Sequence, residues 1–560
     1  MQELSKSQKG RLAIRRFKVI ADALTSRGSY KPSGSSGKTL ENALREISPE
    51  IYGTMNDDRS IEINGLEYVL NRLPRGIEDC NRIILTSQED LENTTFEKIE
   101  PPKRRRISYR MNDREICFVI TRGISEVYDV LTHITFLNIE AKKIHRKMRD
   151  NDGNISPLWI ELRKYIEEKD QLKGKKLDQA IWNLSILLGR TYHETRLTYE
   201  SLEKGRKEIN SNNGIFRIIY QLGEMIEKGL KSNDEDLLIY FTPIFRNMVG
   251  NQTISRTWAK TVNSRIQKLG LEKRPLHIIS ANMHSVMNTL FGYSATHKKT
   301  KEKKKTDIYE YITEIKETTD SILKYSQKNG LCQCIDESGA NIDFQIIDTD
   351  KMKNVVFHPD LKINKDIVKN EKPVILVLDY AFGTQAFEIL EELLNPELQN
   401  NAQQNKNIYS ISVMGKAGIL PGKKGDIMLA TAHVLEGTPH NYLVNNDMGA
   451  DDFSEDVSVY EGPIVTVLGT SLQNRDVLEK FQTSSWNAVG LEMEGGHFQR
   501  AISAAIIRGH IPRDVKTRYA YYASDNPLHS GQTLASGSMG DEGIRPTYMI
   551  TKIIIEKILK

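Results

Sequence analysis

The chain has 560 residues, enough for two to four domains, and its 39% hydrophobic and 27% charged residues are ordinary for a soluble protein with a core. A net charge of +4 is small for this length, so no nucleic-acid partner is predicted. Four cysteines are too few for a disulfide framework, and no apolar run reaches the roughly 20 residues that span a bilayer. With a polar N-terminus as well, we expect a cytoplasmic protein.

The first 270 residues are predicted to be rich in helices. An amphipathic basic helix is expected over 8–27, ended by Gly28, and 39–100 reads as mostly helical. The prolines and basic residues at 101–106 mark a boundary and are interpreted as a solvated linker. We therefore expect a helical N-terminal segment over 1–100 and an α-rich domain of unknown role over 101–270. Further helices are predicted at 156–170, 176–211, 214–232 and 253–269, and 116–120 is either a short strand or the start of a buried helix.

Two short motifs in this part do not carry the chemistry they suggest. Gly37-Lys38-Thr39 lacks the glycine that a phosphate-binding loop needs five positions earlier, where Pro32 stands, so a flexible linker is predicted. His193-Glu194 lacks the second histidine of a zinc motif, because Leu197 occupies its place.

The character of the chain changes near residue 275. Residues 275–285 read as strand, turn and helix, and 373–379 is the near-continuous apolar run of a strand buried on both faces. Another strand is predicted at 408–413, and a C-terminal helix at 547–559. The basic run at 298–305 with a helix at 306–328 is interpreted as an insertion. We expect an α/β domain over 271–560 with an insertion near 295–370.

Cys332 and Cys334 form a C-x-C sequence in this domain. A structural zinc site takes four ligands, and no second pair is present in the sequence. Reduced thiols are therefore predicted, with no metal and no cofactor.

Three stretches follow in a fixed order: a glycine-rich turn at 414–420, a Glu-Met-Glu-Gly sequence at 492–495, and Ser-Asp-Asn-Pro-Leu-His at 524–529. In this order they resemble the nucleoside phosphorylase and nucleosidase superfamily, and the last two are most similar to AMP nucleosidase. The resemblance covers 275–560. It implies a C-terminal nucleoside-phosphorylase-like mixed sheet wrapped by helices, preceded here by the α-rich region.

The resemblance implies that Asp525 donates a proton to the leaving purine. A carboxyl group does this near pH 7 only where burial raises its pKa. An aspartate that caps a turn before Pro527 is the alternative. Glu494 would hold the ribose hydroxyls against an apolar wall made by Met493. Glu492 competes with Glu494 for that role, and the sequence does not separate the two.

The remaining expected ligand contacts are weaker matches. Gly415, Lys416 and Gly418 are expected to form an anion-binding turn. The other expected substrate-binding residues are Thr466, Ser471, Ser524 and His529.

The sequence also departs from the family at two places, and it offers one further candidate feature. The first-strand loop has no acid, so His284 is the candidate general base or phosphate ligand; a surface or capping histidine is the other interpretation. Asn526 stands where AMP nucleosidase has a lysine. A loop at 530–543 with Arg545 is a candidate cover for a phosphate.

The implied activity is hydrolysis of the N-glycosidic bond of a purine nucleotide or nucleoside, which passes through an oxocarbenium-like transition state. Phosphorolysis with inorganic phosphate is the first alternative. A catalytically silent nucleotide sensor and a nucleotide-depleting effector are the others. The superfamily also leads us to expect a homo-oligomer.

Overall fold

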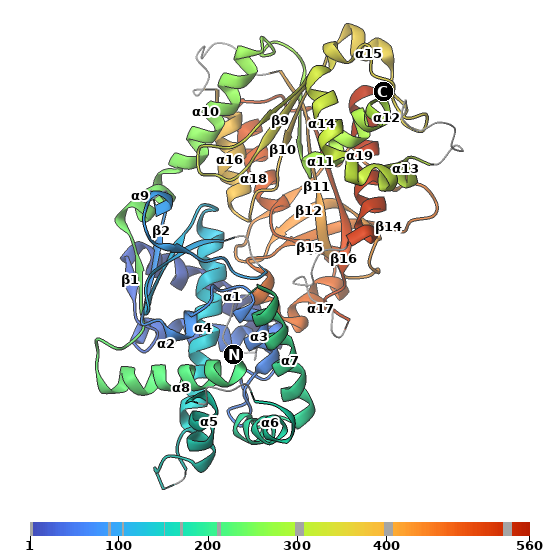
Figure 1. Ribbon diagram of the computed structural model, residues 1–560. Coiled ribbons are helices and arrows are strands. Elements are labelled where there is room, and N and C mark those ends of the chain that lie inside the picture. Colours follow the sequence, from blue (N-terminus) through green and yellow to red (C-terminus); the bar gives the residue numbers. More distant parts are fainter. Residues whose placement is uncertain are drawn as a thin grey trace. The chain divides into compact units, whose positions relative to one another are not determined.

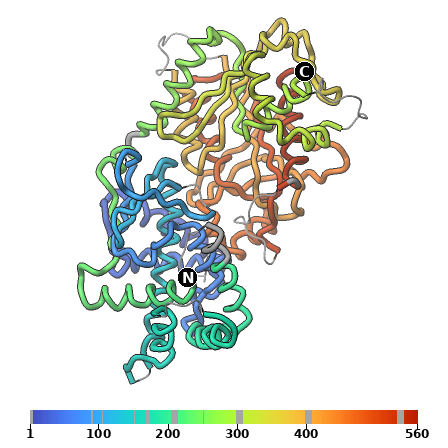
Figure 2. The backbone as a smooth tube through the Cα atoms, viewed as in Figure 1, coloured from blue at the N-terminus to red at the C-terminus, as the bar shows by residue number. Residues whose placement is uncertain are grey.

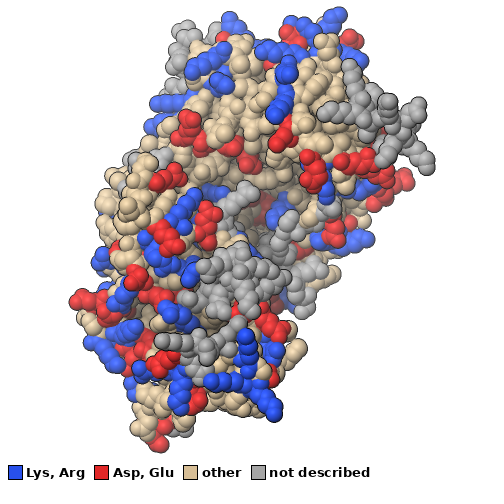
Figure 3. All heavy atoms as spheres, in the orientation of Figure 1, with Lys and Arg blue, Asp and Glu red and all other residues tan. Residues whose placement is uncertain are grey.

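A computed structural model describes residues 4–87, 91–103, 106–150, 152–167, 172–209, 214–296, 307–396, 407–529 and 540–560. The chain forms two compact units (Figures 1 and 2). Unit 1 is Met1–Asn251 with Ser471–Val477, and unit 2 is Gln252–Thr470 with Leu478–Lys560. On the face shown in Figure 3, acidic and basic side chains are interspersed over both units. Within the described ranges, no helix is long and apolar enough to cross a membrane.

Unit 1 contains a six-stranded sheet in the order β1-β6-β2-β5-β4-β3. Its parallel centre is β6, β2 and β5, and the outer strands pair antiparallel. The strands are β1 Ser29–Tyr30, β2 Arg82–Thr86, β3 Glu97–Lys98, β4 Ile107–Asn112, β5 Glu115–Val119 and β6 Leu238–Phe241. The helix-rich character expected for this region is present, but the region also contains this sheet, which was not predicted and which joins strands from both sides of the boundary expected at residue 100.

The helices of unit 1 follow the apolar periodicity more closely. They are α1 Lys6–Arg27, α2 Ser35–Ile47, α3 Ile63–Leu70, α4 Ile124–Lys147, α5 Pro157–Glu167, α6 Gly174–Leu188, α7 Tyr192–Ile209, α8 Ile215–Lys231 and α9 Pro243–Asn251. The predicted first helix is confirmed. The expected single helix over 176–211 is broken at Gly189, whose φ of +65° favours glycine. Gly37-Lys38-Thr39 lies inside α2 and not in a flexible linker.

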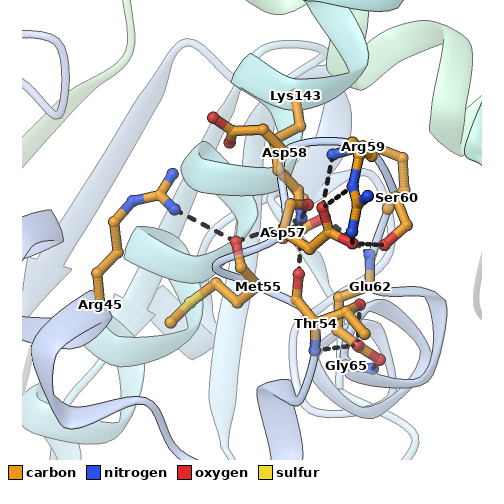
Figure 4. A network of polar contacts seen from close by, with 12 residues as sticks. Arg45, Thr54, Met55, Asp57, Asp58, Arg59, Ser60, Glu62, Gly65 and Lys143 are labelled. Carbon is orange, nitrogen blue, oxygen red and sulfur yellow. Dashed lines mark hydrogen bonds and ion pairs between the residues drawn. The ribbon is translucent and has the colours of Figure 1, made fainter.

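The helix α4 is the buried centre of unit 1 and carries an internal ion pair. The Lys143 ammonium lies 2.9 Å from Glu140 Oε1, and both side chains are fully buried. Lys143 also donates to the carbonyl oxygens of Thr54, Met55 and Asp57, each at 3.3 Å (Figure 4). The loop before α3 is therefore held to α4 by one cation, in the way that buried charges are usually satisfied.

Unit 2 is built on a ten-stranded mixed sheet. Nine strands follow the order β13-β12-β14-β15-β11-β7-β10-β9-β8, and β16 pairs with β11 and β12. The strands are β7 Leu276–Ser280, β8 Leu331–Cys334, β9 Phe344–Asp348, β10 Val374–Leu378, β11 Ile408–Ile419, β12 Ile427–Leu435, β13 Asn441–Leu443, β14 Val459–Thr466, β15 Gly490–Glu492 and β16 Lys516–Asp525. The mixed α/β architecture expected for this part is present. The predicted insertion contributes β8 and β9 to the sheet, and the basic run at 298–305 lies outside the described residues.

Five of these strands close into a ring: β12-β14-β15-β11-β16 and back to β12. The long strand β11 makes this possible. Its first half pairs with β7 of the open sheet on one side, while its second half pairs with β15. A strand shared by an open sheet and a ring brings turns that are distant in the sequence to one place.

Helices cover both faces of the sheet (Figure 1). On one face, α16 contacts both α10 and α18, and the three helices form a layer. On the other face, α11, α13, α14 and α19 share a hydrophobic cluster. The helices of unit 2 are α10 Thr253–Lys268, α11 Met283–Met287, α12 Tyr293–Thr296, α13 Ile308–Ile315, α14 Thr319–Lys328, α15 Lys365–Asn370, α16 Gln385–Leu394, α18 Gly495–Ile507 and α19 Ile544–Leu559. The helix α17, Arg475–Thr483, begins in the segment that belongs to unit 1.

Candidate active site

The two acidic turns of unit 2 meet on opposite sides of Gly418. In the strand register, Leu491 of β15 lies opposite Gly418 on one side and Asp525 of β16 lies opposite it on the other. Neighbouring strands stand about 4.8 Å apart, so Leu491 and Asp525 are separated by about 10 Å. The ring of strands therefore brings together segments that are distant in the sequence.

A β-bulge sets the direction of Asp525. The register runs from Ala417–Ala523 directly to Gly418–Asp525, so Ser524 is an extra residue in β16. One extra residue reverses the alternation of side chains, and bulges re-aim side chains in this way. Asp525 accordingly shares the face of Lys416, whose charge acts on it and favours its ionised form.

The Asp525 carboxyl group is buried and half-satisfied. The residue is only 2% exposed, and the Ser524 hydroxyl donates to its Oδ1 at 2.5 Å. Its Oδ2 is buried and has no hydrogen-bond partner within the described ranges. Burial raises the pKa of Asp525, although Ser524 and Lys416 oppose this. Such a group retains its proton at higher pH than a solvated carboxyl and is suited to give it up to a bound molecule.

The first carboxyl of the Glu-Met-Glu sequence is engaged inside the protein. The backbone N–H groups of Glu494 and Gly495, at the start of α18, both donate to Glu492 Oε2. The Thr466 hydroxyl donates to Glu492 Oε1 at 2.5 Å, and His433 Nδ1 lies 3.5 Å from the same oxygen. Burial disfavours the charge on Glu492, but these partners outweigh it and lower its pKa. Glu492 is thus an ionised group that anchors the helix.

The second carboxyl is less fully engaged. Glu494 is partly exposed at the N-cap of α18, and its Oε1 accepts the N–H of Gly383 at 3.0 Å. Burial and the negative charge of Glu492 raise the pKa of Glu494 to about 8, although the Gly383 N–H opposes this. Glu494 is therefore mainly protonated at neutral pH in the unliganded protein.

The loop after β10 supplies two residues that the sequence analysis did not assign to the site. Gly383 makes the contact with Glu494 described above. The Tyr380 ring lies 3.6 Å from the position that a Gly415 side chain would take, and its hydroxyl hydrogen-bonds the backbone of Asn282. The available signal was their position directly after an apolar strand, since ligands of α/β sheets bind at the carboxyl ends of strands.

The glycine-rich stretch at 415–418 is not a turn. It continues β11, and each of its residues is paired with β16. The expected anion-binding turn at Gly415, Lys416 and Gly418 is therefore corrected to a paired strand, in which the backbone N–H groups do not converge on a ligand. Lys416 is exposed, whereas both glycines are buried.

Two more predicted ligand residues are committed to the protein. The Thr466 hydroxyl donates to Glu492 and accepts the Gly496 N–H at 3.0 Å. Ser471 belongs to unit 1, where it hydrogen-bonds the buried Tyr52, so it is not part of the candidate site in unit 2. Both hydroxyls thus have structural partners.

The remaining predicted residues lie around the carboxyl groups or at the surface. Met493 is buried between the two glutamates. His284 is exposed in the first turn of α11, after β7, and its N–H donates to the Asn282 side chain. His529 is also exposed, and its N–H donates to the Asn526 carbonyl.

Asn526 and Arg545 have structural contacts. The Asn526 side chain donates to the carbonyl oxygens of Leu420 and Gly422 at 3.0 and 2.9 Å, which fastens the turn after β11. Arg545 forms ion pairs with Asp456 and Asp307. Residues 530–539 of the loop expected to cover a phosphate lie outside the described residues.

A sequence model described as a family of unknown function, DUF6909, matches residues 38–319 and 306–560. No functionally curated protein matches the chain. Among solved structures, a 5'-methylthioadenosine/S-adenosyl homocysteine nucleosidase from Campylobacter jejuni has 12% identity and a TM-score of 0.30, over 51% of this chain and 98% of that one. Futalosine hydrolase of Helicobacter pylori has 12% identity and a TM-score of 0.30, over 51% of this chain and 97% of that one. A uridine phosphorylase from Schistosoma mansoni has 14% identity and a TM-score of 0.31, over 51% of this chain and 89% of that one. These likenesses are too slight to assign a function, which has to come from the side chains described above.

Proposed function

This chain belongs to the DUF6909 family. From the side chains of unit 2, we propose that it is a nucleosidase that hydrolyses the N-glycosidic bond of a purine nucleoside or nucleotide. The observation that carries the proposal is the buried Asp525, whose Oδ2 has no partner among the described residues and whose pKa is raised. Without a ligand partner, such a carboxyl would cost stability to bury.

In the proposed reaction Asp525 is the general acid. Cleavage leaves negative charge on the departing base, and a proton delivered to a base nitrogen makes it a better leaving group. The protonated carboxyl of Asp525 provides that proton. After the bond breaks, the carboxylate is stabilised by Lys416 and by Ser524, the two groups that oppose its raised pKa.

Glu494 is the residue proposed to hold the sugar. An ionised carboxylate accepts one hydrogen bond from each of two neighbouring hydroxyls. Glu492, two residues before Glu494, is already ionised, and the backbone N–H of Gly495 at the start of α18 holds it in place. Two negative charges close to the sugar would stabilise the positive charge that develops there as the bond to the base lengthens.

Water is the proposed nucleophile. A phosphate nucleophile needs an anion cradle, and the stretch expected to provide one is a paired strand. In the loop after β10, the N–H of Gly383 donates to Glu494 and the N–H of Phe382 donates to the Gln385 side chain. These N–H groups are therefore not available to form a cradle for phosphate.

The test is to incubate the full chain with adenosine, inosine and AMP, with and without inorganic phosphate, and to quantify released base. We expect release without phosphate, and we expect Asp525→Asn to abolish it while ligand binding is kept. Asp320→Asn, at an exposed position in the first turn of α14, is the control and should behave as wild type.

The pH profile adds a second readout. Because the acid must be protonated, base release should fall as pH rises through the raised pKa of Asp525, provided that the substrate saturates the site at each pH so that the ionisation of Glu494 does not enter. Undiminished turnover by Asp525→Asn would remove Asp525 from its role. Release only with phosphate would make the protein a phosphorylase, and binding without any release would make it a sensor.

A further inference from the structure

Two cysteines lie side by side on the outermost strand of the unit 2 sheet. Cys332 and Cys334 are two residues apart in β8, so their side chains point to the same face, and their sulfur atoms are 3.9 Å apart. Both are partly exposed, and both are free thiols. Because β8 ends the strand order and pairs only with β9 in the described sheet, one side of it carries no strand.

A positive charge acts on both thiols, and it acts more strongly on Cys332 than on Cys334. The Nε–H of Arg265, on α10, donates to Cys332 Sγ at 3.2 Å. A guanidinium beside a sulfur stabilises the thiolate, which is the nucleophilic form. Burial, and then the neighbouring sulfur of Cys332, raise the pKa of Cys334 to about 11, although Arg265 opposes this. Cys332 is therefore placed to react first, and Cys334 to react with whatever Cys332 has bound.

We propose that Cys332 and Cys334 form a reversible redox dithiol that exchanges with low-molecular-mass disulfides such as oxidised glutathione. The Cys332 thiolate attacks one glutathione sulfur, which forms a mixed disulfide and expels one glutathione thiolate. The Cys334 thiolate then attacks Cys332 Sγ, which forms the Cys332–Cys334 disulfide and expels the second glutathione. In total the dithiol loses two electrons and two protons, and one oxidised glutathione becomes two reduced molecules.

The spacing of the two cysteines along β8 makes a Cys332–Cys334 disulfide easy to reduce. Residues two apart in a strand have Cα atoms about 6.6 Å apart, close to the upper limit of about 6.8 Å for disulfides. The sulfur atoms must also approach from 3.9 Å to about 2.05 Å. Closing the bond therefore strains β8, and strained disulfides are reduced more easily. A terminal strand can absorb that strain, because only its pairing with β9 is disturbed.

The other two cysteines provide an internal comparison. Cys80 and Cys117 are buried in unit 1, and burial raises the pKa of Cys80 far above its usual value. Because both are buried, neither has the exposure that the exchange needs.

The experiment uses the full chain equilibrated with mixtures of reduced and oxidised glutathione, quenched with acid, alkylated and analysed by mass spectrometry. Wild type should form the intramolecular disulfide with release of two glutathiones, while Cys80 and Cys117 are alkylated after unfolding. Cys334→Ser should stop at a stable mixed disulfide on Cys332. Cys332→Ser should react severalfold more slowly.

The role of the guanidinium is tested by the rate of the first step. Arg265→Ala should slow it severalfold, whereas Lys268→Ala, three residues further along α10, should not. The proposal is overturned if wild type accumulates only the mixed disulfide, or if no intramolecular bond forms at glutathione ratios that modify Cys334→Ser. An unchanged rate in Arg265→Ala would remove the charge from the mechanism.

Discussion

The affinity of unit 2 for a ligand with two neighbouring hydroxyls should rise with pH, because Glu494 must ionise to accept both hydrogen bonds. Its pKa in the unliganded protein is about 8. Binding such a ligand therefore releases a proton, and proton release is favoured at high pH. Each pH unit below 8 costs about tenfold in affinity, or ~1.4 kcal/mol. At pH 6 the loss is about a hundredfold relative to the plateau at high pH.

Three ionisable groups near Glu494 should not contribute to this slope. The pKa of Glu492 is lowered, and burial raises the pKa of Tyr380 and Tyr521 above their usual values. All three keep one protonation state between pH 6 and 9. The measurement is best made in the Asp525→Asn variant, which removes both turnover and the titration of Asp525.

Calorimetric titration with a nucleoside, at pH 6 to 9 and in buffers of different ionisation enthalpy, measures affinity and proton release together. A matched ligand that lacks the 2′ and 3′ hydroxyls should show a flat profile. In Glu494→Gln the side chain cannot ionise, so binding should be weak and independent of pH. Equal affinity for the diol at pH 6 and 8, without proton release, would refute the role assigned to Glu494.

The other predictions concern stability. Gly495→Ala places a methyl group 2.1 Å from the buried Tyr521 hydroxyl, so it should destabilise the protein by about 1–3 kcal/mol in denaturant unfolding. Gly449→Ala is the control, because its nearest contact is an ordinary 3.7 Å. Lys143→Met should cost about 3–5 kcal/mol by leaving Glu140 without its cation, and adding Glu140→Gln should recover part of the loss. A double variant no more stable than Lys143→Met would contradict the pairing.

The sequence was informative where a local pattern has one structural meaning. The apolar runs of β7 and β10 predicted buried parallel strands, whereas Glu494 and Asp525 were marked by the resemblance that the order of the three motifs carries. The glycines at 415–418 have two meanings. Glycine supports a turn, but it also permits close approach of strands, as in β15 opposite this stretch, where a side chain at Gly490 would lie 2.8 Å from the Gly418 carbonyl oxygen. Only the pairing partner distinguishes these meanings, and a single sequence does not name it.

The other residues and strands that the sequence did not reveal depend on contacts between distant parts of the chain. His433 stands in the middle of β12 with no local sign of chemistry, and it meets Glu492 only because the ring of strands closes. Ser471 follows β14 by a few residues, yet it belongs to unit 1. In unit 1 the parallel strands β2 and β6 are separated by a long helical stretch. Their short apolar runs gave no signal of a shared sheet.

The arrangement of carboxyl groups explains why the proposed site would favour a transition state over its substrate. Glu492 is ionised by its partners, and its charge keeps Glu494 mainly protonated in the unliganded protein. A neutral sugar gives Glu494 only hydrogen bonds as a reason to ionise. As the bond to the base breaks, the sugar becomes positive, and that charge lowers the cost of ionising Glu494 beside Glu492. An interaction that strengthens along the reaction coordinate lowers the barrier, whereas one of constant strength does not.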